Sequence, residues 1–299
     1  MKTVHFQGHD VIELRCGESR ALISPFYGAR LLKWDIGHRP IIHWPEDADW
    51  SNVKSVRGGN PVLFPFIARH MVDGEIGKWK DAEGVIRDLP MHGFVRQMPF
   101  EVAEEDSSES KLTMICRDTE ETRAGYPFCF EFTVTYILSE SGLDCTYSTK
   151  NTGDHALPYF AGHHWYFAIP HTEWSDWEVF IDRSNSVRQD QHGSMYAVED
   201  FAELQLSDES IVDAMHLLSS QAPVKLLNQK KGEEIQIDLD FPASVPWYAV
   251  TTWREFPDSG YYCVEPWLGL PNAIHHGQGL RHVAPGATEL AQCAVRVIA

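Results

Sequence analysis

The sequence has little positive charge and no long apolar run. Its 299 residues contain 25 Lys and Arg against 43 Asp and Glu, a formal net charge of -18 at pH 7. Nucleic acids and anionic membrane surfaces bind basic patches, so this balance excludes both as partners. No apolar stretch approaches the ~20 residues of a membrane-spanning helix. The first residues, MKTVHFQGHDVIEL, also lack the apolar stretch of a secretory signal, so we expect a cytoplasmic protein.

Several common catalytic signatures are also missing. There is no GxSxG nucleophile elbow, no phosphate-binding P-loop and no GxGxxG dinucleotide motif. The six cysteines are scattered without a CxxC pair, and Cys129 and Cys145 stand in apolar, strand-like runs where a free thiol acts as a small hydrophobe. These absences argue against a nucleophilic hydrolase, a nucleotide cofactor and a disulfide framework. We expect reduced cysteines and no cofactor.

Alternating apolar and polar residues, typical of β-strands, recur along most of the chain. In FCFEFTVTYIL (128–138) the side chains of Phe130, Phe132 and Val134 share one face, and LDCTYST (143–149) and EIQIDLDF (234–241) repeat the pattern. Turn signals such as NTGD, KKGEE, PDSG and APG separate these runs. Many short strands joined by turns predict an all-β fold, a large antiparallel sandwich.

One window favours a helix instead. In SDESIVDAMHLL (207–218), Ser207 is a candidate N-cap, and Ile211, Met215 and Leu218 recur near helical spacing. No linker, composition shift or internal repeat divides the chain, so we expect a single domain over residues 1–299.

The segment from Arg57 to Arg96 gathers the most suggestive polar residues. It reads RGGNPVLFPFIAR, then a polar, hairpin-like insert, then MHGFVR, and it brings Arg57, Arg69, His92 and Arg96 into an acidic protein. Arg and His are hydrogen-bond donors of fixed geometry, and the neighbouring glycines predict a close approach of the backbone to a small ligand. A polar small-molecule pocket is the functional interpretation, and a surface loop with scattered charges is the alternative.

Two further stretches are candidates for chemistry. In YYCVEPWLGLPNAIHHG, Glu265 stands alone among apolar and aromatic residues, where burial raises and a nearby cation lowers the pKa of a carboxyl group. It is either a working base or the partner of a structural arginine. In LPYFAGHHWYFAIP, His163 and His164 point to opposite faces if the segment is a strand, so at most one of them faces a given pocket.

Paired histidines also raise the question of a metal. His163, His164, His275 and His276 show no HxH, HxxxH or CxxC spacing. Adjacent residues on a strand do not easily bind one ion. We expect no metal site.

These motifs together resemble the aldose 1-epimerases, or galactose mutarotase-like proteins, in the branch that includes hexose-6-phosphate mutarotases. The likeness rests on RGGNPVLFPFIAR, MHGFVR, AGHHWYF and CVEPWLGLPNA in this order, over residues 57 to 273. It implies a β-supersandwich that covers the whole chain and a sugar as the small-molecule substrate.

The resemblance also implies roles for individual residues. His164 is the general acid, with His163 as the alternative one position away, and Glu265 is the general base. The residues expected to bind the sugar are Arg57, Arg69, His92, Arg96 and, on a thin local match, Asp213. Departures are Trp165, where relatives commonly have proline, and Ala68, where a glycine is common.

The implied reaction is the interconversion of the α and β anomers of an aldose by opening and closing of its ring. It requires Glu265 ionised and His164 protonated, and we expect an arginine to keep the glutamate charged while the glutamate raises the pKa of the histidine. A free hexose is favoured because the net charge repels a dianion, although Arg57 and Arg69 beside Arg96 are a possible phosphate clamp. A carbohydrate-binding protein without activity is the alternative from another class, since fold does not fix function.

Overall fold

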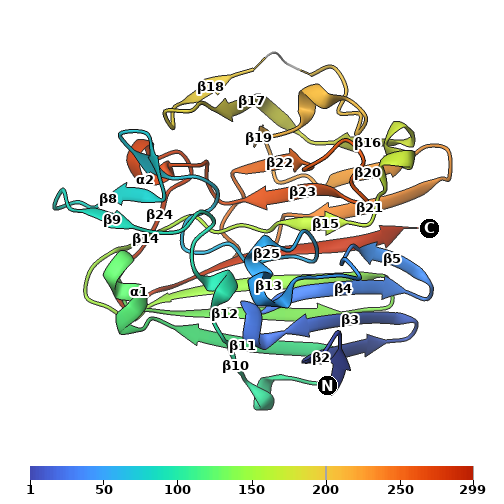
Figure 1. The fold of residues 1–299 in the computed structure, drawn as a ribbon, viewed down its shortest axis with the longest axis horizontal. Coiled ribbons are helices and arrows are strands. Elements are labelled where there is room, and N and C mark those ends of the chain that lie inside the picture. Colours follow the sequence, from blue (N-terminus) through green and yellow to red (C-terminus); the bar gives the residue numbers. More distant parts are fainter. Residues whose placement is uncertain (199–200, 299) are drawn as a thin grey trace.

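The computed structural model, which describes residues 1–198 and 201–298, contains two large antiparallel β-sheets (Figure 1). The larger sheet has, in spatial order, β1 (Lys2–Phe6), β2 (His9–Cys16), β3 (Ser19–Ser24), β4 (Arg30–Ile36), β5 (Arg39–Ile42), β15 (Trp165–Phe167), β23 (Tyr262–Trp267), β22 (Ala249–Trp253), β19 (Ala214–Leu218), β17 (Arg183–Gln189) and β18 (Met195–Ala197). The smaller sheet has β10 (Glu101–Val102), β11 (Lys111–Arg117), β12 (Phe130–Leu138), β13 (Gly142–Asn151), β25 (Thr288–Ile298), β21 (Glu233–Asp238), β20 (Val224–Asn228) and β16 (Trp177–Phe180).

The remaining elements are short. Three further strand pairs are β14 (Leu157–Tyr159) with β24 (Arg281–Val283), β6 (Met71–Val72) with β7 (Glu75–Ile76), and β8 (Lys78–Lys80) with β9 (Ile86–Asp88). The α-helices are α1 (Glu120–Gly125) and α2 (Ala273–His276). The 3₁₀ turns are Pro25–Tyr27, Trp50–Ser55, Val95–Gln97, Glu104–Asp106, His171–Asp176 and Glu209–Ile211. The all-β prediction is confirmed, and the expected insert consists of β6 to β9. In the described part of the chain, no helix combines the length and apolarity needed to cross a membrane.

The predicted alternation is confirmed in the smaller sheet. On β12, Phe132, Val134 and Tyr136 are buried while the residues between them are partly exposed. Strand β13 pairs in register, with Tyr147 opposite Val134. Strand β12 packs on β2 and β3 of the larger sheet. Burial of one face of each strand between the two sheets therefore accounts for the period of two.

The segment RGGNPVLFPFIAR runs into this core rather than along the surface. Phe64 stacks on Phe132 with ring centroids 4.3 Å apart, and Phe66 stacks on Phe160 at 4.7 Å. The aromatic residues in the middle of the motif are therefore structural, and their packing holds the polar residues at both ends of the motif in place.

The helix expected over residues 207–218 is wrong. Only a 3₁₀ turn forms there, and the residue that caps it is Asp208 rather than Ser207. Strand β19 follows and pairs with both β17 and β22. The cross-strand hydrogen bonds and the burial of Met215 override the local helical spacing.

Neighbouring strands of the larger sheet turn one face toward a common hollow. The register pairs Trp165 with Val264 and Thr251 with Glu265. Residues paired directly across neighbouring strands point to the same face of the sheet, so Glu265 and Thr251 share a face. His164, directly before β15, lies beside Glu265. Sheet register thus brings together residues about 100 positions apart in the chain.

Candidate active site

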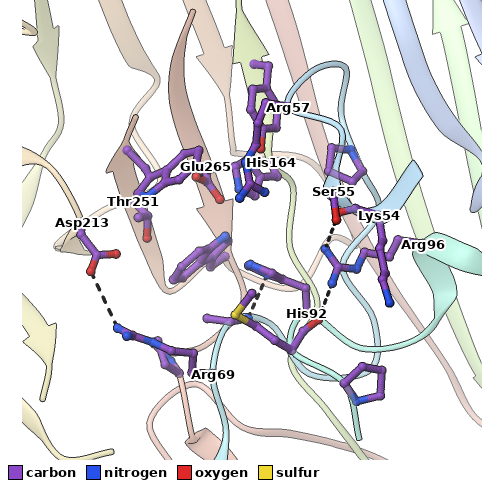
Figure 2. A pocket seen from close by; sticks show the side chains of 18 of the residues that line it. Lys54, Ser55, Arg57, Arg69, His92, Arg96, His164, Asp213, Thr251 and Glu265 are labelled. Carbon is purple, nitrogen blue, oxygen red and sulfur yellow. Dashed lines mark hydrogen bonds and ion pairs between the residues drawn. The ribbon is translucent and has the colours of Figure 1, made fainter. Parts of the chain in front are cut away.

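A cavity of about 460 Å³ lies over this face of the sheet, and Figure 2 shows its lining. All seven residues singled out from the sequence line it: Arg57, Arg69, His92, Arg96, His164, Asp213 and Glu265. In Figure 2, Asp213 and Arg69 lie on one side of the His164–Glu265 pair, and Lys54 and Arg96 on the other. The fold therefore collects the predicted polar residues around a single hollow.

The two proposed acid–base groups face each other on the cavity floor. Nδ1 of His164 lies 3.4 Å from Oε1 of Glu265, and both side chains are buried, 10% and 2% exposed. The ring of Tyr166 stacks on that of His164 at 4.6 Å and nearly parallel, which holds the imidazole plane. Among the described residues, the ion-pair partner of Glu265 is this histidine and not a structural arginine.

Hydrogen bonds distinguish the two adjacent histidines. Asn60 accepts from the backbone N–H of His164 at 2.8 Å, so its amide nitrogen faces Nδ1 of His163, 3.0 Å away. An amide nitrogen only donates, so Nδ1 of His163 is an acceptor, which the hydroxyl of Tyr147 also contacts at 2.8 Å. Desolvation lowers the pKa of His163 to about 3. His163 is a neutral core residue outside the cavity lining, and His164 faces the cavity, as expected for opposite faces.

The expected charge state of the pair is not the one that burial favours. Desolvation raises the pKa of Glu265 well above its ordinary value, and Asp213 raises it further. Desolvation also lowers the pKa of His164 well below 6.5, and nearby cationic groups, among them Arg30, add to this. The expectation that an arginine keeps Glu265 ionised is therefore wrong, as is the expected rise in the pKa of the histidine. The favoured form is a protonated glutamate beside a neutral imidazole.

Two of the predicted arginines already have carboxylate partners. Arg57 donates to both oxygens of Glu255, at 2.9 and 2.8 Å, which raises the pKa of the arginine. Nη2 of Arg69 lies 3.7 Å from Oδ2 of Asp213. The charges of the two arginines are thus partly compensated within the protein.

Arg96 differs from these two. It donates to the backbone carbonyls of Met91 and Lys54, and its Nε is buried without a partner. In the described ranges, no carboxylate lies within ion-pair distance of it. Desolvation lowers the pKa of Arg96 to about 10, so it remains a cation with free hydrogen-bonding capacity.

His92 enters the cavity from a left-handed backbone position, with φ of 64°. Its Nδ1 accepts from the backbone N–H of Ala68, which is itself left-handed with φ of 53°. Nε2 therefore carries the ring proton. Non-glycine residues with a left-handed backbone are uncommon and cluster at functional sites. Asp213, which lines the same cavity, is another example, with φ of 61°.

The glycines of the motif have a different role from the expected one. A Cβ on Gly59 would lie 2.1 Å from the carbonyl oxygen of Leu31, and one on Gly93 would lie 2.0 Å from that of Phe64. Both have positive φ, and neither lines the cavity. They permit close contacts between backbone segments, so the expectation that they admit a ligand is wrong.

The sequence did not reveal two polar residues of the lining. Oγ1 of Thr251 and Oε1 of Gln189 are buried and have no hydrogen-bond partner. Buried polar atoms ordinarily have partners. These oxygen atoms are therefore suited to bind the hydroxyl groups of a ligand. The signal that could have identified Thr251 is its cross-strand pairing with Glu265.

The four histidines considered as metal ligands do not share one site. His275 and His276 lie in α2, and across the residues that the structure describes they belong to no converging group of metal ligands. The group that does converge is His164, Cys263 and Glu265. Among the large aromatic residues, Tyr166, Trp253 and Trp267 line the cavity, whereas Trp165 and Trp247 fill the core.

Comparison with known proteins places this site in a family. The model of the aldose 1-epimerase family matches residues 10–290, nearly the whole chain. The chain belongs to the aldose 1-epimerase family. No curated protein sequence matches it.

Solved structures with the same fold cover the full length of this aldose 1-epimerase family member. The Slr1438 protein from Synechocystis is 23% identical, with a TM-score of 0.81 and 99% of each chain covered. A galactose mutarotase related enzyme from Lactobacillus acidophilus is 23% identical, with a TM-score of 0.79 and 97% of each chain covered. A galactose mutarotase-like protein from Clostridium acetobutylicum is 19% identical, with a TM-score of 0.80, 99% of this chain and 97% of that chain. The predicted fold type is thereby confirmed.

Proposed function

We propose that this protein interconverts the α and β anomers of a free aldose, a hexose, by acid–base-catalysed opening and closing of the sugar ring. The observation that carries the proposal is the pairing of His164 and Glu265 on the floor of a cavity rimmed by hydrogen-bond donors. Membership of the aldose 1-epimerase family supports it.

The chemistry needs one base and one acid on the same anomeric carbon. Glu265 takes the proton of the O1 hydroxyl while His164 delivers a proton to the ring oxygen, and the C1–O5 bond breaks to give the open-chain aldehyde. Rotation by half a turn about C1–C2 presents the other face of the carbonyl, and the reverse transfers close the ring. A positioned acid or base typically contributes on the order of 10²–10⁴ in rate.

The neutral pair favoured by burial contains the proton that this reaction needs. Protonated Glu265 with neutral His164 differs from the ion pair only by the transfer of one proton between two groups 3.4 Å apart. The ion pair begins the ring opening, and the neutral pair is what ring opening leaves behind. Burial therefore favours the enzyme form that accompanies the open-chain sugar, and the two groups titrate as a unit.

The rest of the cavity provides for the hydroxyl groups. Arg96 and the Nε2–H of His92 are donors, and Thr251 and Gln189 have unpartnered oxygen atoms. Trp253 and Trp267 supply apolar surface for the faces of a sugar ring. Such a mixture is typical of small polar ligand sites.

An uncharged sugar fits the charge distribution. Arg57 and Arg69, the proposed phosphate clamp, already face Glu255 and Asp213. A phosphate would have to break these contacts or bind at the Arg96 side alone. We therefore expect a higher kcat/KM for a free hexose than for its 6-phosphate.

Polarimetry of freshly dissolved α-glucose, α-galactose and glucose 6-phosphate, with and without protein, tests the proposal. We expect faster equilibration of at least one free hexose. The gain should fall by about 10²-fold or more in Glu265→Gln and in His164→Asn.

Three outcomes would redirect the proposal. If no sugar equilibrates faster but a sugar binds, the protein is a carbohydrate-binding protein on this fold. If both variants keep full activity, the acid–base assignment is wrong. If glucose 6-phosphate is the best substrate, the substrate class changes and the chemistry of the pair stays.

A further inference from the structure

A third potential metal ligand lies next to the acid–base pair. Cys263 comes two residues before Glu265 on β23, so both side chains point to the same face of the sheet. The ligand atoms of His164, Cys263 and Glu265 all lie within 4.8 Å of one another, and all three residues are buried. Over residues 1–198 and 201–298, no other group of three or more His, Cys, Asp or Glu converges in this way.

Two of these ligand atoms have no hydrogen-bond partner. They are Nδ1 of His164 and Oε2 of Glu265, both buried. Buried polar atoms are ordinarily hydrogen-bonded, and exceptions call for an explanation such as a bound ion. Their side chains are nine-tenths or more buried and converge with the thiol of Cys263 beside the cavity.

We propose that His164, Cys263 and Glu265 form a binding site for a thiophilic divalent cation, Zn²⁺ or Cd²⁺, and that the bound ion blocks the sugar site. Imidazole nitrogen, thiolate sulfur and carboxylate oxygen are the three ligand types of protein-bound zinc. The thiol selects against Mg²⁺ and Ca²⁺, which take oxygen ligands. The sulfur of Cys263 and the carboxylate of Glu265 bond to the ion as the thiol proton and the carboxyl proton leave to water. Metal binding stands by itself, whereas the inhibition rests on the proposed function.

The distances suit a zinc-sized ion after a small adjustment. Zinc bonds of about 2.0–2.3 Å in a tetrahedron place ligand atoms roughly 3.3–3.6 Å apart. The His164–Glu265 separation of 3.4 Å already has this value. The largest separation in the group, at most 4.8 Å, must shorten by roughly 1 Å, which a rotation of the Cys263 side chain supplies.

Positive groups near the site do not prevent binding. The positive charges of Arg30, Arg57 and Arg96 all lower the pKa of His164. Arg57 is paired with Glu255, and Arg30 donates to backbone carbonyls. A dication bound by one thiolate and one carboxylate adds no net charge, so the arginines face the same total charge as with the protonated ligands.

The consequence for turnover follows from the atoms that are occupied. A metal ion on His164 and Glu265 takes the lone pairs with which they would exchange protons with a sugar. A sugar in the cavity and an ion at this site therefore exclude each other. His164 and Glu265 either move protons on the sugar or, together with Cys263, hold an ion.

Cobalt binding tests the site without reference to activity. The purified full chain, freed of metals with a chelator, is titrated with Co²⁺, and the near-ultraviolet thiolate-to-cobalt absorption band is followed. We expect one equivalent of Co²⁺ to produce the band and Zn²⁺ to remove it by competition. Cys263→Ala should abolish the band, and Cys129→Ala, the same change at a cysteine outside the site, should keep it.

A second measurement uses turnover. Zn²⁺ should inhibit mutarotation of the wild-type protein, and the concentration for half-inhibition should rise at least about tenfold in Cys263→Ala, with each variant compared to its own rate without metal. Saturating sugar should weaken the Co²⁺ band of the wild-type protein.

The outcomes separate the two proposals. If the wild-type protein shows no cobalt–thiolate band, or if correctly folded Cys263→Ala keeps it, the metal site is wrong even where mutarotation is fast. If the band forms and Zn²⁺ displaces it but no sugar is turned over, the metal site stands and the proposed function falls. Should Cys263→Ala not fold, absence of the band in the wild-type protein still refutes the site.

Discussion

Strands β13 and β23 bury their side chains in two different ways. On β13, Leu143, Cys145 and Tyr147 are buried toward the other sheet, while most residues between them are partly exposed. On β23 every residue from Tyr262 to Trp267 is buried, because the core covers one face and the cavity walls cover the other. A polar residue on the outer face of β13, such as Thr146, can turn to water. The carboxyl group of Glu265 on β23 cannot reach water in this way, so its burial costs free energy unless a partner or ligand compensates it.

The first prediction has the largest expected effect. It compares a glutamate on a strand that is buried on both faces with one on a strand that is buried on one face. Glu265→Gln should lower the mutarotation rate by about 10²–10⁴-fold, because the base is lost while the shape is kept. Glu131→Gln, on the outer face of β12 and paired with Arg117, is the matched control. Polarimetry and thermal unfolding of both variants provide the measurement. Equal activity in the two would mean that burial on both faces does not mark a working residue.

The second prediction concerns the one-sided strand. Leu143→Ala removes a fully buried side chain of β13 and should lower the free energy of unfolding by about 2–5 kcal/mol. The cavity lies on another sheet, so kcat of the folded fraction should stay near the wild-type value. Denaturant unfolding and activity at low temperature check both parts. A large loss of kcat in a folded variant would show that the two sheets are coupled.

The third prediction concerns Asn60, which links the two histidines. Asn60→Ala removes the acceptor for the backbone N–H of His164 and should lower kcat by about 10- to 100-fold through misplacement of the acid, with little change in KM. Tyr147→Phe removes the contacts of the hydroxyl with Nδ1 of His163 and the carbonyl of Gly162, neither of which involves His164, and should have a much smaller effect on kcat. If the two variants behave alike in steady-state kinetics, Asn60 acts through the core and not through His164.

The fourth prediction, with the smallest expected effect per residue, concerns how buried histidines make the stability depend on pH. Desolvation lowers the pKa of His163 and His216 to about 3 and that of His70 to about 4. The unfolded chain therefore binds protons near pH 6.5 before the native state does, so stability is present above pH 6.5 and falls as the pH decreases. Each of these histidines adds a slope approaching about 1.4 kcal/mol per pH unit.

Denaturant unfolding between pH 7 and pH 5 measures this slope. Glu265 contributes with the opposite sign, because its raised pKa makes the native state bind the extra proton. Glu265→Gln should therefore steepen the loss of stability toward acid. A free energy of unfolding that stays constant over this range would contradict the neutral burial of the histidines.

Several parts of the fold and the site could be predicted from local sequence. Period-two alternation identified β12 and β13, because each strand has one covered face. Isolated polar residues in apolar surroundings, such as Glu265 and His164, identified members of the cavity. The same local reasoning failed at 207–218, where strand pairing overrides helical spacing.

Other features depend on neighbours that are distant in sequence. Asn60 bonds to residues more than 100 positions away, and Cys263 comes near His164 only through the pairing of β15 with β23. No local pattern contains such contacts. The protonation of the pair likewise depends on the depth of burial, which becomes known only once the sheets are packed.

The amino-acid sequence by itself determined the β-rich character, the acidic surface and the identity of the polar residues available for chemistry, since these follow from composition and from side-chain alternation. The tertiary structure alone decided which histidine faces the cavity, which arginines already have partners and in which direction burial shifts the pKa values of His164 and Glu265. The physical reason is that register, burial and local charge are properties of packed neighbours rather than of single segments.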